Sequence, residues 1–106
     1  MKGDLVLGFE QLEINKEMVF STAHITKRDD EILEHLVLKD GNRNVDKFGY
    51  GYRLLISKQS FEDGFDYHEL SAFVCFLMGI ALLGGCKWLV LDRDGPVIDS
   101  LPVHEW

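Results

Sequence analysis

His24 is the residue of this chain best suited to acid–base chemistry, because imidazole can gain or lose a proton near neutral pH. Thr22 and Ser21 stand just before it and carry hydroxyls that an adjacent base could activate. A carboxylate from Asp92 or Asp94 could orient the imidazole if the fold brings the ends of two strands together. These residues define one hypothesis, a small enzyme that uses His24 with Thr22 or Ser21 and one of the two acids.

A structural role is the alternative interpretation of His24. No acid stands at a recognisable spacing from it, and no nucleophile elbow accompanies it. The histidine precedes a predicted helix, where free backbone N–H groups could receive an anion, and it could equally hydrogen-bond to neighbouring backbone. We therefore expect a protein that is not an enzyme and keep His24 catalysis as the alternative.

The segment 92–96, Asp-Arg-Asp-Gly-Pro, follows an apolar stretch and offers two carboxylates one residue apart. Such a pair could hold a hard cation through its oxygens, although the segment is too short for a calcium-binding loop. Asp-Gly is also a common turn pair in which the aspartate accepts a hydrogen bond from its own backbone. We predict a turn here, with Arg93 free to pair elsewhere.

The remaining motifs predict neither a metal site nor a cofactor. The four histidines show no zinc-ligand spacing with Cys75 or Cys86. The glycine-containing segment 48–52 lacks the lysine and the following helix of a phosphate-binding loop, so its tyrosines are assigned to packing. Both cysteines lie in or beside an apolar segment and are expected to be free thiols.

The charge balance of 18 acidic against 11 basic residues gives a net charge of −7. This charge repels phosphate backbones and anionic lipids, so we expect no direct nucleic-acid binding and no membrane binding. Acidic side chains could instead meet a basic protein surface, or they could simply stabilise helix N-termini and solubility. The candidate binding residues are Asp29, Asp30, Glu31, Asp92, Arg93 and Asp94.

The first half of the chain predicts strands and one helix. One or two strands are expected before Thr22, where 18–20 is rich in strand-forming residues. Thr26 and Asp29 have the spacing of a capping box, and apolar residues then recur at helical spacing, which predicts a helix over about 27–39. The polar stretch 39–44 predicts a loop, and 48–57 predicts one strand.

The second half predicts a helix over about 67–83 followed by a buried strand. Asp66 is the expected N-cap of this helix, with Glu69 completing a capping box, and the glycine pair 84–85 is its expected stop. The helix is apolar nearly all round, with a stripe of small side chains that includes Ser71, so burial or a homodimer through 67–83 is expected. The continuously apolar stretch 87–92 predicts a central strand.

Length and pattern together predict one α+β domain over residues 1–106. We expect a small mixed or antiparallel sheet of about four to five strands packed with the two helices. No secretion signal is visible, and the longest apolar run is shorter than the ~20 residues that span a bilayer, so a cytoplasmic protein is expected. The expected core residues are Phe73, Phe76, Leu77, Ile80, Leu89 and Leu91.

Two sequence blocks, 20–26 and 88–98 with the closing Leu101, Pro102 and Trp106, resemble an uncharacterised domain family of bacterial chromosomes, plasmids and phages. The resemblance spans about 20–106, while residues 1–19 match nothing in it. It implies a small cytosolic accessory protein, often carried by mobile elements beside anti-restriction or other anti-defence genes. It implies no activity and transfers no catalytic residue.

The function expected from these observations is stoichiometric binding to a host or mobile-element protein. An enzyme that acts on nucleic acid is one such partner, because an acidic surface could enter its basic groove. The enzyme hypothesis around His24 remains the alternative.

Overall fold

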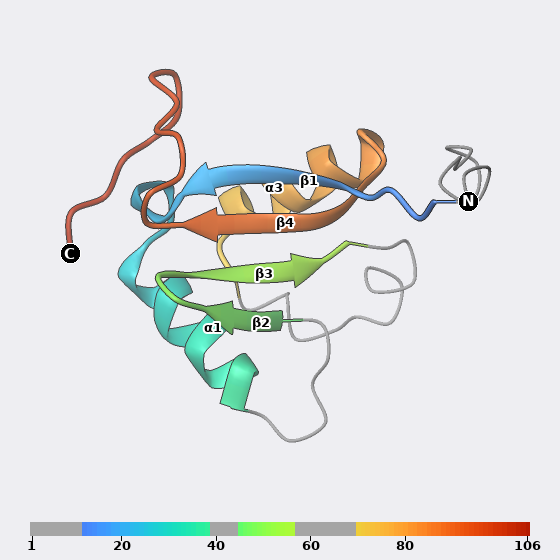
Figure 1. Ribbon diagram of the computed structural model, residues 1–106. Coiled ribbons are helices and arrows are strands. Elements are labelled where there is room, and N and C mark those ends of the chain that lie inside the picture. The colour runs from blue at the N-terminus through green and yellow to red at the C-terminus, as the bar shows by residue number, and fades with distance from the viewer. Residues whose placement is uncertain (1–11, 39–44, 57–69) are drawn as a thin grey trace.

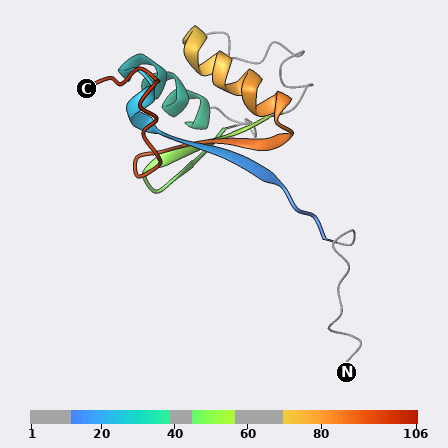
Figure 2. The ribbon, with the colours of Figure 1, turned by 90° about the horizontal axis from the view of Figure 1, so that it is seen from above.

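The computed structural model describes residues 12–38, 45–56 and 70–106, which form an α+β domain. A four-stranded mixed sheet packs against two α-helices (Figure 1). Both helices lie on the same side of the sheet when the domain is seen from above (Figure 2). The expected fold class is therefore confirmed.

The sheet has the order β1-β4-β3-β2. Its strands are β1 (Lys16–Ser21), β2 (Val45–Phe48), β3 (Gly51–Leu55) and β4 (Cys86–Asp92). Strand β4 pairs in parallel with β1 and antiparallel with β3, while β2 pairs antiparallel with β3. The prediction that the apolar stretch 87–92 is a central strand is confirmed, because β4 lies between β1 and β3 in the sheet.

Helix α1 spans Lys27–Leu38 and begins as the sequence predicts. The Asp29 carboxylate accepts a hydrogen bond from the Thr26 backbone N–H at 3.1 Å, and the Thr26 hydroxyl accepts one from the Asp29 N–H at 3.0 Å. Each side chain thus satisfies a backbone donor that the first helical turn leaves free. The loop predicted at 39–44 lies outside the described residues.

Helix α3 spans Ala72–Leu83, and its first described residues differ from the prediction. Ser71 is extended and acts as the N-cap, its hydroxyl accepting from the Val74 N–H at 3.4 Å. It is therefore not part of a mid-helix stripe. The expected cap Asp66 and Glu69 lie outside the described residues. Gly85, with φ of +73°, provides the expected glycine stop.

The segment 48–57 is not one strand, because the chain turns back at Gly49 and Tyr50. Phe48 ends β2 and pairs with Gly51, the first residue of β3, so the two strands form a hairpin. Gly49 has φ of +33°, a backbone conformation that glycine adopts without strain. A Cβ on Gly51 would lie 2.1 Å from the Leu91 carbonyl oxygen, so this strand position requires glycine.

The core lies between the helices and the sheet. Leu77, Leu89 and Leu91 are buried there as predicted, whereas Phe76 is 57% exposed and was wrongly assigned to the core. Phe73 is partly buried against the core, and Ile80 is of intermediate exposure. Helical geometry explains the exposure of Phe76. Successive residues of a helix point about 100° apart, so Phe76 points away from the face that is turned to the core. That face carries Val74, Leu77, Met78 and Ala81.

Cys75 and Cys86 are thiols and form no disulfide, as predicted. Cys75 lies in α3 and Cys86 at the start of β4, and burial raises the pKa of the Cys75 thiol. Among the helices of the described segments, none has the length and apolar character needed to cross a membrane.

Candidate binding site at the end of the central strand

The His24 ring is completely buried, and hydrogen bonds use both of its nitrogens. Its Nδ1 atom lies 2.7 Å from the Pro102 carbonyl oxygen, and its Nε2 atom lies 2.9 Å from the Ile98 backbone nitrogen. A carbonyl can only accept and an N–H can only donate, so Nδ1 carries the proton and Nε2 accepts. The imidazole is therefore neutral, and the geometry supports the structural interpretation of His24.

The His24 bonds belong to a set that fastens the C-terminal tail to the chain around residues 21–25. The Ser21 N–H donates to the Pro96 carbonyl at 3.0 Å, and the His104 N–H donates to the Ala23 carbonyl at 2.8 Å. The Trp106 indole N–H donates to the Ile25 carbonyl at 3.0 Å. The tail thus runs past the end of β1 (Figure 1), and the two blocks that the sequence singled out form one structural unit.

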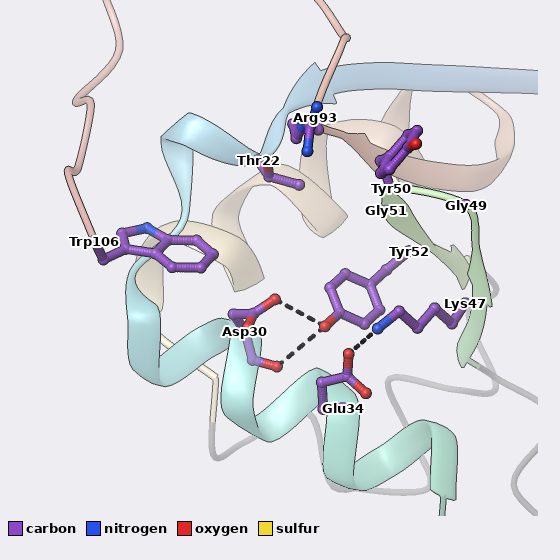
Figure 3. A pocket seen from close by; sticks show the side chains of 10 residues that line it. All are labelled: Thr22, Asp30, Glu34, Lys47, Gly49, Tyr50, Gly51, Tyr52, Arg93 and Trp106. Carbon is purple, nitrogen blue, oxygen red and sulfur yellow. Dashed lines mark hydrogen bonds and ion pairs between the residues drawn. The ribbon is translucent and has the colours of Figure 1, made fainter.

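A pocket of about 280 Å³ opens beside this unit (Figure 3). Helix α1 forms its floor, the β2–β3 hairpin forms one wall, and the residues after β4 and at the end of the tail close the other sides. The lining residues are Thr22, Asp30, Glu34, Lys47, Gly49, Tyr50, Gly51, Tyr52, Arg93 and Trp106.

The floor of the pocket is a fixed polar network. The Tyr52 hydroxyl donates to the Asp30 carboxylate at 2.8 Å, and Lys47 forms an ion pair with Glu34. Burial and the hydrogen bond to Asp30 raise the pKa of the Tyr52 hydroxyl above its usual range. The hydrogen bond from Lys47 lowers the pKa of the Glu34 carboxyl. Tyr52 therefore stays protonated, and Glu34 stays ionised and paired.

The Arg93 guanidinium lies on the opposite side, over the ring of Tyr50 at 4.5 Å from the ring centroid. The Arg93 backbone N–H also donates to the Tyr50 carbonyl at 3.0 Å, which fixes the start of the side chain. Arg93, Thr22 and Trp106 also line a neighbouring hollow with His104. Arg93 thus stands where two hollows meet.

The structure brings together three of the residues named from sequence, since Thr22, Asp30 and Arg93 all line the pocket. Asp29 does not join them, because it is buried and its carboxylate accepts from the Ser71 N–H and hydroxyl, each at 2.8 Å. Burial would raise the pKa of Asp29, but the hydrogen bonds from Ser71 and Thr26 outweigh it and lower the pKa. Asp29 ties α1 to the start of α3.

The acids of the 92–96 segment form the predicted turn. The Asp92 carboxylate accepts from the Asp94 N–H at 3.0 Å, and the Asp92 carbonyl accepts from the Gly95 N–H at 2.9 Å. Asp94 and Glu31 are exposed, and neither lines the pocket. Within residues 12–38, 45–56 and 70–106, no group of histidine, cysteine and acidic side chains is arranged to hold a metal ion.

Sequence reasoning missed the aromatic part of the pocket. Tyr50 and Tyr52 were assigned to packing alone, and Trp106 was noted only as the end of a sequence block. One signal was available, because a buried tyrosine normally finds a hydrogen-bond partner for its hydroxyl. For Tyr52 that partner is Asp30, which the sequence had already named as a binding residue.

Comparison with known proteins places the chain in a family. No curated protein and no solved structure matches it. One family model matches residues 17–106, which includes the sheet, both helices, the His24 contacts and the pocket. The resemblance noted from the two sequence blocks is thereby confirmed. The chain belongs to the family described as "Family of unknown function (DUF5983) C-terminal domain".

Proposed function

We propose that this protein acts by stoichiometric binding to another protein, of the host or of a mobile element, rather than by catalysis. The observation that carries the proposal is the hydrogen bonding of His24, because both of its ring nitrogens bond to the backbone of the C-terminal tail. A general base needs a free lone pair within reach of the proton that it removes. His24 has none, so its contacts serve to build the surface around the pocket.

The charge of the chain supports a basic partner. A net charge of −7 favours encounter with a positive protein surface, such as the groove of an enzyme that acts on nucleic acid, and opposes direct binding to DNA. Glu31 on α1 and Asp94 in the turn after β4 are exposed and follow two pocket residues, Asp30 and Arg93. Glu31 and Asp94 are the acids of the predicted binding set whose side chains are exposed.

The enzyme alternative has less structural support. It needs His24 to contact Thr22, Asp92 or Asp94, and the ring instead contacts the backbone of Ile98 and Pro102. The Asp92 carboxylate is engaged within its own turn. Only Thr22 lines the pocket.

A pull-down from host lysate across a salt series tests the proposal. The variant carrying Glu31→Lys and Asp94→Lys should lose a partner that the unaltered chain retains at low salt. The matched control carries Glu13→Lys and Glu17→Lys, which change the net charge equally on exposed residues at and before the start of β1. It should keep the partner. Binding should weaken as screening shortens to ~3 Å near 1 M salt.

The captured complex must then be reconstituted from purified components, with a fixed molar ratio determined by native mass spectrometry. Equal loss of the partner in both double variants would show only a general charge effect. Turnover of a substrate that His24→Ala abolishes in a folded protein would overturn the proposal, as would tight, salt-sensitive binding to duplex DNA.

Self-association through α3 belongs to the same proposal. Phe76 is 57% exposed and Leu83 is 89% exposed, so this helix presents large apolar side chains that could meet a second copy. Light scattering on the unaltered chain and on Phe76→Glu tests it. The expected result is a dimer that the substitution converts to a monomer, and a monomer in both samples would exclude this dimer.

A further inference from the structure

We propose that the pocket between Asp30 and Arg93 binds a small zwitterion, a molecule that carries both an ammonium and a carboxylate group as free amino acids do. This inference does not depend on the protein-binding function proposed above. It rests on the distribution of charge inside the pocket, on the way the charged groups are held, and on the aromatic side chains beside them.

Four charged side chains line the pocket, and two of them neutralise each other. Lys47 and Glu34 form an ion pair at the floor. Asp30 and Arg93 are left, and in the described part of the chain neither has an ion-pair partner. Figure 3 shows them on opposite sides, Asp30 on α1 and Arg93 beside Tyr50. The pocket therefore offers a negative group at one side and a positive group at the other.

The two charges are held apart by their neighbours. The Asp30 carboxylate accepts from the hydroxyl of Tyr52, which is only 3% exposed and cannot follow a large movement. The Arg93 guanidinium stacks on Tyr50, and its backbone N–H bonds to the Tyr50 carbonyl. These contacts reduce the conformational entropy lost when a ligand bridges the two groups.

This arrangement selects against ligands with a single charge. A simple anion that approached Arg93 would also meet Asp30, in a protein of net charge −7. A simple cation that approached Asp30 would also meet Arg93. A zwitterion avoids both repulsions, because each of its charged groups faces the opposite charge on the protein.

The aromatic residues favour an apolar side chain on that ligand. Trp106 and Tyr50 line the pocket beside the polar floor, and the indole is oriented by its hydrogen bond to Ile25. The volume of about 280 Å³ is close to the lower end of the ~300–1,000 Å³ range typical of ligand pockets. An amino acid with an aromatic or aliphatic side chain suits both the size and the lining.

Titration with three related compounds tests the inference. L-phenylalanine carries both charges, L-phenylalaninamide lacks the carboxylate, and N-acetyl-L-phenylalanine lacks the ammonium. In nitrogen–proton correlation spectra, phenylalanine should shift the indole signal of Trp106 and the backbone signals of the pocket. Each of the two analogues should bind about tenfold more weakly, since each loses one charge-assisted contact.

Two conservative variants assign the two contacts. Arg93→Gln should bind phenylalanine and phenylalaninamide equally, because the variant lacks the positive charge that faces the ligand carboxylate. Asp30→Asn should bind phenylalanine and N-acetylphenylalanine equally, because the variant lacks the negative charge that faces the ligand ammonium. Asparagine retains an oxygen that can accept from Tyr52, so the floor should stay intact. Glu17→Gln, which removes an exposed negative charge on β1 outside the pocket lining, should keep the full preference for phenylalanine.

The inference is overturned if millimolar phenylalanine shifts no pocket signal, or if the three compounds bind the unaltered protein with equal affinity. Signals that move only outside the pocket would also contradict it. These outcomes concern the unaltered chain, so they stand even if a variant fails to fold. They leave the pull-down result unaffected, because that experiment follows the exposed acids Glu31 and Asp94.

Discussion

The Nδ1 atom of His24 lies 2.7 Å from the carbonyl oxygen of Pro102, a residue 78 positions further along the chain. This bond and the one from the Ile98 N–H to Nε2 place a neutral imidazole between the start of α1 and the C-terminal tail. His24, the residue whose type best suits acid–base chemistry, thus links the chain before α1 to the C-terminal tail, and these bonds position the tail that carries Trp106 into the pocket.

Replacement of His24 by alanine should lower the free energy of unfolding by about 2 to 4 kcal/mol, because it leaves a cavity in place of a buried ring and removes the hydrogen bonds to the Ile98 N–H and the Pro102 carbonyl. Chemical denaturation measures the loss. Amide hydrogen exchange should show faster exchange at Ile98 and His104, whose N–H groups bond to this region. Unchanged protection at both amides would mean that the tail is held by other contacts.

Replacement of Asp29 by asparagine should destabilise the domain at pH 7 by about 2 to 4 kcal/mol, because the carboxylate accepts three hydrogen bonds at the junction of α1 and α3. Folding lowers the pKa of Asp29 below the ~3.9 of an unfolded aspartate. The ionised group therefore stabilises the fold above that value, and this contribution is lost as the pH falls toward the lower folded pKa.

Denaturant unfolding at a series of pH values checks this linkage. The difference in stability between the unaltered chain and Asp29→Asn should be largest near pH 7 and should narrow below about pH 4. A difference that stays constant over this range would show that the charge of Asp29 does not contribute, and that only its shape matters.

Truncation of two neighbouring residues of α3 should change stability by very different amounts. Leu77→Ala should cost about 2 to 5 kcal/mol because Leu77 is 1% exposed in the core. Phe76→Ala is the matched control, since Phe76 is largely exposed in the single chain and should change the stability of the monomer by no more than about 0.5 kcal/mol. Thermal melts compare them. Equal shifts in Tm would contradict the orientation of this helix.

Two glycine-to-alanine substitutions should change the stability of the protein in opposite directions. Gly51→Ala would bring a Cβ to 2.1 Å from the Leu91 carbonyl oxygen, so β3 and β4 must separate and the fold is strongly destabilised. Gly79→Ala meets nothing within 4 Å inside α3 and should stabilise the protein by about 0.5 to 1 kcal/mol. Tm values of both variants check the pair. A tolerated Gly51→Ala would contradict the close approach of the two strands.

The sequence alone determined the features that depend on neighbouring residues. The Thr26–Asp29 capping box, the glycine stop after α3, the turn at 92–96 and the apolar strand β4 were all predicted correctly. Each of these signals lies within a few residues of its effect, because caps, turns and periodicity act over one or two helical turns or a single strand.

Only the tertiary structure decided what distant residues do together. Ser71 caps α3 while its N–H and hydroxyl bond to Asp29, 42 residues away, and Trp106 reaches the pocket through a bond to Ile25, 81 residues away. The sequence named Asp30 and Arg93 as separate binding residues, but not that they share one pocket without pairing. Which donors and acceptors meet depends on the path of the whole chain, and no local spacing encodes that path.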